Sequence, residues 1–389
     1  MRIALIHHHY LQRGGEDAVF DAERDLLARR HEVVTYETSS RDLPRNPLRA
    51  AGLSLWNEDQ RRRVRDFLRR ERPEVVHVHN TFPLLSPAIL RAADGLGLPL
   101  VQTLHNYRLL CVNGLLFRDG HVCEECVGRL PLPGVRHACY RGSRAGSAAV
   151  AAMLGLHRTA GTWDGVDTFV TLTEFAREKL AQGGLPRERM VVKPNFVTDP
   201  GVGRGGGGAL FVGRLTPEKG VRTLLDAWRL VGGRLPLQIV GDGPLAGELA
   251  GGLPEGVTYL GPRAPEEVRA RMGEASAVLV PSLWYEGALP LTVIEAFSTG
   301  TPVIASRLGA MPTLIEEERQ GLLFEAGDPA ALAGRVLQVL DRPELLDRMR
   351  VGARAAYEAH YTPEVNERML MDVYTRAREG RARRQRGAA

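Results

Sequence analysis

The chain has 389 residues, a length that favours two domains of less than about 200 residues each over a single core. Hydrophobic residues make up 44% and charged residues 25%, an ordinary globular balance that excludes a disordered chain. The net charge of +5 comes almost entirely from arginine, and without an aromatic-interleaved basic platform it does not indicate nucleic-acid binding.

Strands alternate with helices along the whole chain. In the first half we expect strands at 2–6, 32–36, 74–79, 99–105, 167–172 and 190–193, and helices at 16–30, 58–70, 146–159 and 174–181. In the second half we expect strands at 209–212, 237–240, 257–260, 277–280, 302–305 and 322–324, and helices at 221–230, 245–250, 265–272 and 290–298. This alternation predicts an α/β protein with two doubly wound, Rossmann-like domains.

The chain carries no pattern typical of membrane insertion or export. It has no run of about 18 apolar residues, and its first apolar segment is only as long as a strand and ends at His7. We therefore expect a cytoplasmic protein. Arginine-rich runs at 60–72 and 376–386 are typical of a solvated helix and a frayed tail, and peripheral contact with anionic lipid on the inner face of the membrane is the alternative.

A glycine-rich stretch separates the two halves. Five glycines fall within residues 203–208, which predicts a linker at 199–208 between domains at 1–198 and 209–362. Gly203, Gly205 and Gly208 also fit the pattern G-x-G-x-x-G, but that fingerprint follows a strand, and here it precedes one. Ligands of doubly wound sheets bind at the carboxyl ends of strands, so we expect the site in the cleft between the domains.

The most informative segment is 281–295. An apolar strand leads into a turn that holds Glu286, and a helix beginning at Pro290 then carries Glu295. Proline is favoured at the first helical position, and a helix start offers free N–H groups to an anion. A phosphate seat beside two carboxylates that can accept hydroxyl groups predicts a sugar nucleotide as the ligand.

Two further motifs in the second half fit the same ligand. Arg214 and Lys219 bracket a proline turn after a strand, and two cations at a sheet edge suit a diphosphate. Lys219 is one of only three lysines in this arginine-rich chain. The turn at Gly241 and Gly243 lies between a strand and a helix, so it is either a tight glycine turn or a close approach to a base or ribose.

The histidines fall at the ends of predicted strands. The tandem histidines at 7–9 suggest a metal site or a tag, but alternate strand residues point to opposite faces, so we expect His7 or His9 on the acceptor side. His77 and His79 share one strand face, where a buried hydrogen-bonded pair and an acceptor-site role are both open. His105 ends its strand at the predicted cleft.

All four cysteines lie within one irregular stretch of the first half, at Cys111, Cys123, Cys126 and Cys139. The C-x-x-C spacing is that of a metal knuckle, and four thiolates would satisfy tetrahedral zinc. Disulfides are rare in a reducing cytoplasm. A single C-x-x-C with two lone cysteines leaves structural zinc and ordinary thiols as alternatives.

The ordered series of motifs resembles the retaining glycosyltransferases of family 4, which have the two-domain GT-B fold. The resemblance covers essentially the whole chain and rests on Gly14-Gly15-Glu16, His79-Asn80, His105-Asn106-Tyr107-Arg108, Arg214 with Lys219, Gly241-Asp242-Gly243-Pro244, and the segment from Glu286 to Glu295. It implies transfer of a sugar from a nucleotide-diphosphate sugar to a hydroxyl of a glycan, a lipid-linked glycan or a small molecule. It also implies that a helix at 363–380 packs back onto the first domain.

The resemblance assigns roles to the matching residues. Catalysis would involve His105, Arg214, Lys219 and Glu286, with the two cations on the diphosphate and His105 near the anomeric centre. Donor contacts would also come from Gly14, Gly15, Gly241, Gly243, Gly287, Leu291 and Glu295. His9 and His79 would lie on the acceptor side. No catalytic metal is expected, because in this family the leaving phosphate helps to deprotonate the acceptor.

One spacing departs from the family pattern. Eight residues separate Glu286 from Glu295, one more than the resemblance implies, so the assignment of Glu295 on the helix is the safer of the two. Two other functions share parts of this architecture: a sugar-nucleotide 2-epimerase and a nicotinamide-dependent oxidoreductase. The sequence does not disclose the donor base, the sugar, the acceptor or the oligomeric state.

Overall fold

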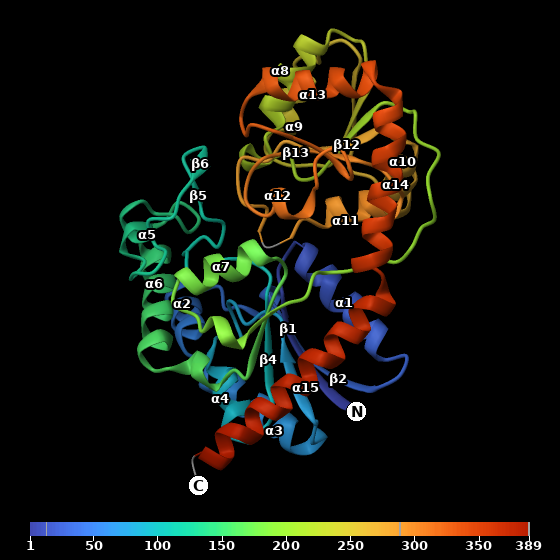
Figure 1. Ribbon diagram of the computed structural model, residues 1–389. Helices are drawn as coiled ribbons and strands as arrows, with labels where there is room; N and C mark the ends of the chain where they lie inside the picture. Colours follow the sequence, from blue (N-terminus) through green and yellow to red (C-terminus); the bar gives the residue numbers. More distant parts are fainter. Residues whose placement is uncertain (13, 288, 388–389) are drawn as a thin grey trace. The chain divides into compact units, whose positions relative to one another are not determined.

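The computed structural model describes residues 1–12, 14–287 and 289–387 (Figure 1). These residues form two compact units. Unit 1 comprises Met1–Leu116, Glu124–Pro194 and the chain from Asn366 onward. Unit 2 comprises Phe117–Cys123 and Asn195–Val365. Each unit is built on a six-stranded sheet, which confirms the predicted α/β class.

Unit 1 has a parallel sheet in the order β2-β1-β3-β4-β7-β8. Its strands are β1 (Arg2–His9), β2 (Glu32–Ser39), β3 (Val75–Val78), β4 (Leu100–Leu104), β7 (Thr168–Thr171) and β8 (Met190–Val192). The strand order changes direction between β1 and β3, so the loops that follow these two strands flank the topological switch point, where ligands of such sheets bind.

Helices and short 3-10 turns connect these strands. They are α1 (Gly15–Leu27), η1 (Ser40–Asp42), α2 (Pro47–Leu55), α3 (Glu58–Glu71), α4 (Ala88–Asp94), α5 (Leu132–Arg136), α6 (Arg144–Thr159), η2 (Thr162–Gly165), α7 (Glu174–Gln182) and η3 (Arg187–Arg189). Local capping fixes several starts. The Asn57 side chain accepts the N–H of Gln60 at 3.1 Å, and Thr173 accepts the N–H of Ala176 at 3.1 Å.

Unit 2 has a parallel sheet in the order β11-β10-β9-β12-β13-β14. Its strands are β9 (Ala209–Val212), β10 (Leu237–Val240), β11 (Val257–Gly261), β12 (Ala277–Val280), β13 (Val303–Ser306) and β14 (Gly321–Phe324). The switch point falls between β9 and β12. A hairpin of β5 (Phe117–Arg118) and β6 (His121–Val122) also groups with this unit.

The helical elements of unit 2 are η4 (Pro217–Lys219), α8 (Val221–Val231), α9 (Ala246–Ala250), α10 (Pro265–Glu274), α11 (Leu291–Ser298), α12 (Met311–Leu314), α13 (Pro329–Asp341) and α14 (Pro343–His360). In α8 the apolar residues recur at helical spacing and bury Leu224 and Trp228 completely. They belong to the same hydrophobic core as Ile239 and Phe324 of the sheet. This core fixes the strands whose carboxyl ends position the site.

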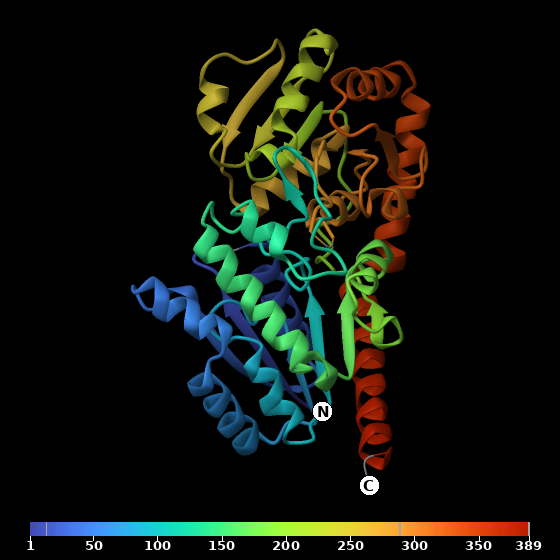
Figure 2. The same cartoon turned by 90° about the vertical axis from the view of Figure 1, so that its left-hand side faces the viewer.

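The C-terminal helix corrects one sequence interpretation. The run at 376–386 is not a frayed tail, because α15 (Pro363–Gly387) continues through it. Tyr374 packs in the core of unit 1, and α15 runs alongside that sheet (Figure 2). The Arg381 guanidinium lies 2.7 Å from Asp94 and 3.1 Å from Asp167, and these two ion pairs hold the end of the helix in place.

The glycine-rich stretch at 199–208 lies within unit 2. The N–H of Gly203 donates to the carbonyl of Thr299 at 2.9 Å, and that of Gly205 donates to Gly273 at 2.9 Å. A Cβ on Gly203 would fall 2.1 Å from the Gly273 carbonyl oxygen. Close backbone packing therefore accounts for a glycine at this position, and the residues from Asn195 onward group with unit 2 as far as Val365.

Candidate functional site

Three loops meet at the carboxyl edge of the unit 2 sheet. The loop after β9 is tied to the loop after β10 by the N–H of Leu215, which donates to the Asp242 carbonyl at 2.9 Å. It is tied to the loop after β12 by the N–H of Leu283, which donates to the Glu218 carbonyl at 2.8 Å. The three segments predicted to bind the donor are therefore joined at one end of this sheet.

Three glycines permit this close approach. A Cβ on Gly241 would lie 1.9 Å from the carbonyl oxygen of Gly213, and one on Gly220 would lie 1.8 Å from that of Pro281. A Cβ on Gly243 would lie 2.6 Å from the Leu215 carbonyl oxygen. The Gly241 and Gly243 turn is thus a packing requirement between loops, which was the simpler of its two sequence interpretations. Nucleotide contact there stays a prediction.

Lys219 and Glu286 form an ion pair at the switch point. The ammonium nitrogen lies 2.6 Å from Oε2 of Glu286, whose side chain is only 5% exposed. The Ser282 hydroxyl donates to the other carboxylate oxygen, and the ammonium also lies 5.6 Å from the centre of the Trp284 ring. A small cavity beside the pair is lined by Ser282 and Thr292. A fixed cation is therefore present where a diphosphate was expected.

The turn before α11 holds Glu286 and Gly287. Glu286 and Gly287 both have left-handed backbones, with φ of 56° and 58°. Ala288 lies outside the described residues. Pro290 is the N-cap and not the first helical residue, so the helix begins at Leu291, one position later than predicted. Glu295 lies on this helix, and the effect of the additional residue on the position of Glu286 stays a prediction.

The remaining donor residues differ in their surroundings. The Arg214 side chain is 64% exposed, and its guanidinium lies 3.7 Å from Glu218. Glu295 is partly buried, and burial raises the pKa of its carboxyl group above the usual range, while the charge of Arg269 lowers it. Thr292 lines the cavity beside Lys219 and lies on the same helix as Glu295.

At the end of β1, Asp17 gathers the residues of the predicted glycine motif. One carboxylate oxygen lies 2.9 Å from His7 Nε2 and 2.9 Å from His9 Nδ1, and the other accepts the N–H of Gly14 at 2.9 Å. Burial raises the pKa of Asp17, but these hydrogen bonds outweigh it and lower the pKa to about 2. Gly15 begins α1 directly after Gly14.

His9 is held within unit 1 on both ring nitrogens. Its Nε2 lies 2.8 Å from Glu37, opposite the bond to Asp17. The strand β1 is longer than predicted because its pairing with β2 continues to His9 and Ser39. An acceptor-side role for His9 stays a prediction, and a ligand there would have to replace one of these bonds.

His79 and His105 are brought together. His79 Nδ1 lies 3.1 Å from His105 Nε2, and His79 Nε2 lies 3.4 Å from a Glu23 oxygen. The other oxygen of Glu23 lies 2.5 Å from the Lys193 ammonium. His77 takes the buried alternative, with its nitrogens bonded to Thr103 and Tyr374.

A pocket in unit 1 lies at the ends of β3 and β4. Its lining includes Tyr10, Glu16, Asn80, His105, Asn106 and Arg108. Glu16 Oε2 accepts from Asn106 at 3.3 Å, and its buried Oε1 has no hydrogen-bond partner among the described residues. Burial, with the nearby Asp17 charge, raises the pKa of Glu16 to about 7. A buried carboxyl oxygen without a donor is a candidate hydroxyl-binding group.

The four cysteines are not gathered into a ligand set. Within the described part of the chain, groups of three or more ligand atoms within 4.8 Å of one another are His7, His9 and Asp17, and Glu23, His77 and His79. Neither group includes a thiol, and Cys111 donates to Asn113 at 2.9 Å. Structural zinc stays a prediction, and a cysteine-to-serine set that left metal content and folding unchanged would refute it.

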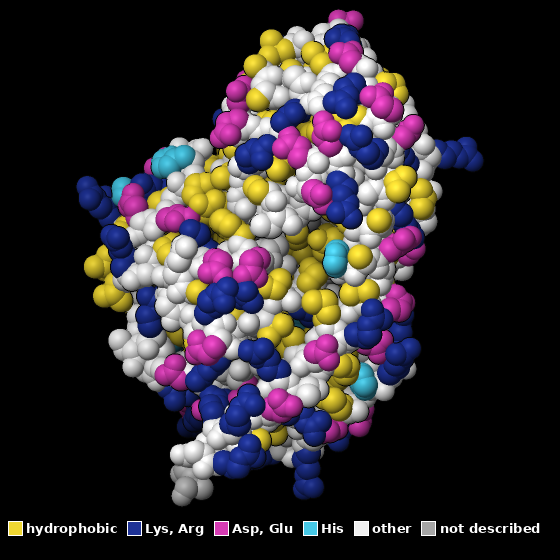
Figure 3. All heavy atoms as spheres, viewed as in Figure 1, with side chains coloured by type: hydrophobic (Ala, Val, Ile, Leu, Met, Phe, Trp, Pro, Cys, Tyr) yellow, Lys and Arg dark blue, Asp and Glu magenta, His cyan; other side chains and the backbone are white. Residues whose placement is uncertain are grey.

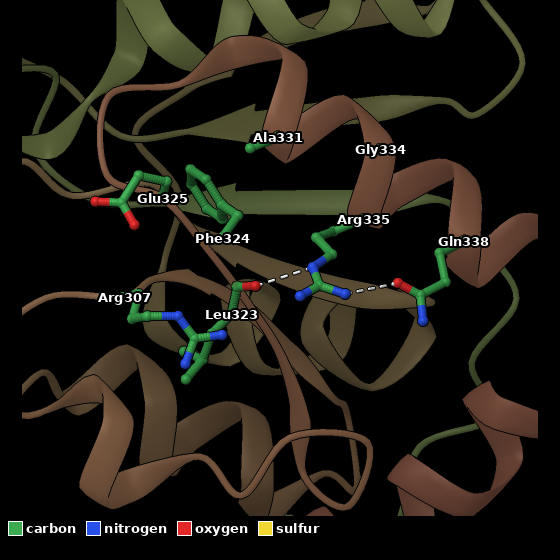
Figure 4. Close-up of a pocket in the computed structure, with 8 residues that line it drawn as sticks. All are labelled: Arg307, Leu323, Phe324, Glu325, Ala331, Gly334, Arg335 and Gln338. Atoms are coloured by element: carbon green, nitrogen blue, oxygen red, sulfur yellow. Dashed lines mark hydrogen bonds between the residues drawn. The ribbon is translucent and has the colours of Figure 1, made fainter.

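A separate pocket of about 400 Å³ lies beside β14 and α13 (Figure 4). Arg335 points into it but donates to the Leu323 carbonyl at 2.9 Å and to Gln338 at 3.0 Å. Its remaining Nη group lies 2.6 Å from Glu317, which also pairs with Arg307 at 2.8 Å. Protein groups hold these arginines, and the pocket contains none of the predicted site residues.

The arginine-rich run at 60–72 forms α3. Arg61 and Arg62 pair with Glu58, and Arg63 pairs with Asp59. Figure 3 shows basic and acidic side chains interspersed over one face of the molecule. In the described residues, no helix is both long and apolar enough to cross a bilayer.

Comparisons with known proteins agree with this geometry. Residues 6–195 match the family model "Glycosyl transferase 4-like domain", and residues 207–342 match "Glycosyl transferases group 1". The phosphatidyl-myo-inositol mannosyltransferase of Mycobacterium leprae is 30% identical over 80% of this chain and 76% of its own length. The chain therefore belongs to the family 4 glycosyltransferases, as the sequence motifs predicted.

Other relatives match over shorter regions. The D-inositol 3-phosphate glycosyltransferase of Corynebacterium efficiens is 34% identical over 43% of this chain and 42% of its own length. In that alignment and those with similar relatives, the chain spans less than half of their length. The crystal structure of Anabaena HepE in complex with UDP has a TM-score of 0.66 over 96% of this chain and 100% of HepE, at 17% identity, and confirms the GT-B fold.

The sequence interpretation missed several residues that shape these sites. Glu23 and Lys193 are buried partners that lie 170 positions apart in the chain, so no local pattern joins them. Lys193 is, however, one of the three lysines. The rarity that singled out Lys219 would also have singled out Lys193.

Proposed function

We propose that this protein is a retaining glycosyltransferase that moves a sugar from a nucleotide-diphosphate sugar to an acceptor hydroxyl. The observation that carries the proposal is the placement of Lys219 and Glu286 at the switch point of unit 2. A doubly wound sheet binds its ligand at this point, and a fixed ammonium there favours a pyrophosphate.

The donor would occupy the edge of unit 2 where three loops meet. Lys219 and Arg214 would bind the pyrophosphate, and Glu295 would accept the ribose hydroxyls. Glu286 would accept hydroxyls of the transferred sugar. For this, Lys219 must leave Glu286 and turn toward the phosphate when the donor binds. UDP is the favoured nucleotide because HepE, which shares the fold, was crystallised with UDP.

In the transfer, the bond between the anomeric carbon and the diphosphate oxygen breaks. The acceptor oxygen forms its bond to that carbon on the same face, and its proton passes to the departing phosphate. The negative charge that develops on the diphosphate would be stabilised by the cationic side chains of Lys219 and Arg214. His105 would contact the sugar near its reacting carbon, and Gly14 and Gly15 would offer backbone N–H groups to the donor.

Incubation with a panel of sugar nucleotides tests the proposal. We expect release of free nucleoside diphosphate and, with an acceptor, a product that keeps the anomeric configuration of the donor. An epimeric sugar nucleotide without release would indicate a 2-epimerase. A change in nicotinamide absorbance would indicate an oxidoreductase. Either result, without diphosphate release, would refute the proposal.

Peripheral contact with anionic lipid stays a prediction. In α15, Arg381 and Arg384 are held on Asp94 and Asp167, whereas Arg70 at the end of α3 is 68% exposed, so we favour the end of α3 for this contact. Flotation with anionic vesicles that is lost at moderate salt would support this contact, and equal flotation with neutral vesicles would contradict it.

A further inference from the structure

A buried chain of polar groups ends at His105. It runs from Lys193 through Glu23 and His79, with separations of 2.5, 3.4 and 3.1 Å between successive atoms. The side chains of Lys193, Glu23 and His79 are all 0% exposed. These three side chains are therefore away from solvent, so each must find its partner within the protein.

The lysine fixes the direction of the hydrogen bonds. Lys193 can only donate, and Glu23 Oε1 and Asn366 Oδ1 accept from it at 2.5 and 2.9 Å. Glu23 is therefore ionised, and burial, which raises its pKa, is outweighed by Lys193, so that the pKa lies well below its usual range. The remaining oxygen, Oε2, then needs a donor.

His79 is the group that can supply this donor. Its Nε2 and Glu23 Oε2 are both buried and have no hydrogen-bond partner among the described residues, and they lie 3.4 Å apart, so each is the nearest group that can satisfy the other. The proton of His79 therefore sits on Nε2. A second proton on His79 would place another positive charge in a buried cluster whose one carboxylate is already paired with Lys193. With its proton on Nε2, the Nδ1 of His79 is the acceptor.

We propose that Glu23 and His79 are positioning residues that set the tautomer of His105. Because His79 Nδ1 accepts, His105 Nε2 must carry its proton and donate across the 3.1 Å contact. This leaves His105 Nδ1 as a bare acceptor for a ligand hydroxyl in the unit 1 pocket, which His105 lines. A role of His105 Nδ1 in sugar transfer rests on the proposed function. The tautomer of His105 does not depend on it.

One substitution should reverse the direction of the hydrogen bonds that lead from residue 23 to His105. In Glu23→Gln, Lys193 still requires the amide oxygen, so the amide NH₂ faces His79. His79 must then accept at Nε2 and donate from Nδ1, and His105 must accept at Nε2 and carry its proton on Nδ1. The variant thus changes His105 from a hydroxyl acceptor to a donor, with almost no change in side-chain shape.

Nitrogen-15 NMR of the histidine-labelled full chain reads both states directly. The His105 signals are assigned by their loss in His105→Gln. We expect a protonated Nε2 and a bare Nδ1 in the wild type, and the reverse in Glu23→Gln. Glu37→Gln is the matched control, since Glu37 pairs with His9 instead, and it should leave the His105 pattern unchanged.

A wild-type His105 protonated on Nδ1, or an unchanged pattern in Glu23→Gln, would overturn the inference. The wild-type spectrum decides even if the variant does not fold. In turnover assays, Glu23→Gln should lower kcat at least about tenfold while nucleoside diphosphate affinity changes less than about twofold. A protein with the expected tautomers and no activity on any sugar nucleotide would refute the proposed function and leave this inference standing.

Discussion

The Lys219 ammonium and the Glu286 carboxylate lie 2.6 Å apart, although the two residues are separated by 67 positions in the chain. Their loops follow β9 and β12, the strands on either side of the switch point. The pair places a cation and a hydroxyl acceptor where the family pattern predicts the diphosphate and the sugar. It also means that donor binding must exchange one Lys219 contact for another.

Lys219→Met should separate diphosphate binding from nucleoside binding. Loss of the cation should weaken UDP about 100-fold and uridine less than about threefold, because only the diphosphate meets the ammonium. Titration calorimetry measures both. Arg222→Met is the matched control, since Arg222 lies three positions away and pairs with Glu248 on the surface. Equal weakening of UDP and uridine would contradict the assignment.

The same variant should unfold more easily. Removing Lys219 leaves the buried Glu286 charge without its partner, which costs about 3 kcal/mol. Adding Glu286→Gln should recover part of that free energy of unfolding but none of the UDP affinity. Urea titration of the single and double variants checks this. Recovery of UDP binding by the second substitution would show that Lys219 acts only on structure.

Glu295→Gln tests the ribose contact. In the wild type, removal of the 2′-hydroxyl from UDP should weaken binding about tenfold, as expected for a lost hydrogen bond to a charged group. In the variant, UDP and 2′-deoxy-UDP should bind alike. If the variant still distinguished the two nucleotides as strongly as the wild type, Glu295 would not hold that hydroxyl.

Glu16 should give stability a pH dependence. Its pKa is raised to about 7 in the folded chain from an ordinary 4.5, so the native state resists ionisation that the unfolded state undergoes. The contribution of Glu16 to the free energy of unfolding is fully present below pH 4.5 and is lost as the pH rises through 7. Glu16→Gln should therefore gain about 1–3 kcal/mol relative to wild type between pH 5 and pH 8.

Unfolding by urea at the two pH values measures this gain. Glu37→Gln is the control, because hydrogen bonds from His9 and Thr35 outweigh burial and lower the pKa of Glu37. Its contribution is lost only as the pH falls below the ordinary range, so this variant should show no trend between pH 5 and 8. A flat difference for Glu16→Gln as well would mean that Glu16 is ionised in the folded chain.

The arginines of α15 offer a structural test. Arg381 is 8% exposed and pairs with Asp94 and Asp167, so Arg381→Met should lower the free energy of unfolding by about 3 kcal/mol. Arg383 is 65% exposed, and Arg383→Met should cost less than about 0.5 kcal/mol. Equal effects on thermal unfolding would argue that the C-terminal turns do not anchor to unit 1.

Most of the fold could be predicted from local sequence patterns. The apolar runs Ala209–Val212 and Ala277–Val280 are buried at every position except Val212, and the bounds of both strands were predicted correctly. The short helices Pro47–Leu55 and Ala88–Asp94 were not predicted, because a few apolar residues give too little helical periodicity. The tail was misread because its arginines find Asp94 and Asp167 at distant positions.

The sites were predictable only where residues follow strands in recognisable motifs. Lys219 and Glu286 could be named from the sequence, but their direct contact could not, because it depends on how two loops pack. The same holds for Asp17, which collects His7, His9 and Gly14, and for the buried Glu23. Long-range polar contacts leave no periodic trace in a sequence, and they determine the electrostatics of both units.

A crystal structure of the protein soaked with a UDP-sugar tests the assignment of the donor site most directly. The pyrophosphate should lie within hydrogen-bond distance of the Lys219 ammonium, with the ribose hydroxyls on Glu295 and the sugar hydroxyls on Glu286. A nucleotide bound away from the carboxyl ends of β9 and β12, with the Lys219–Glu286 pair undisturbed, would contradict it.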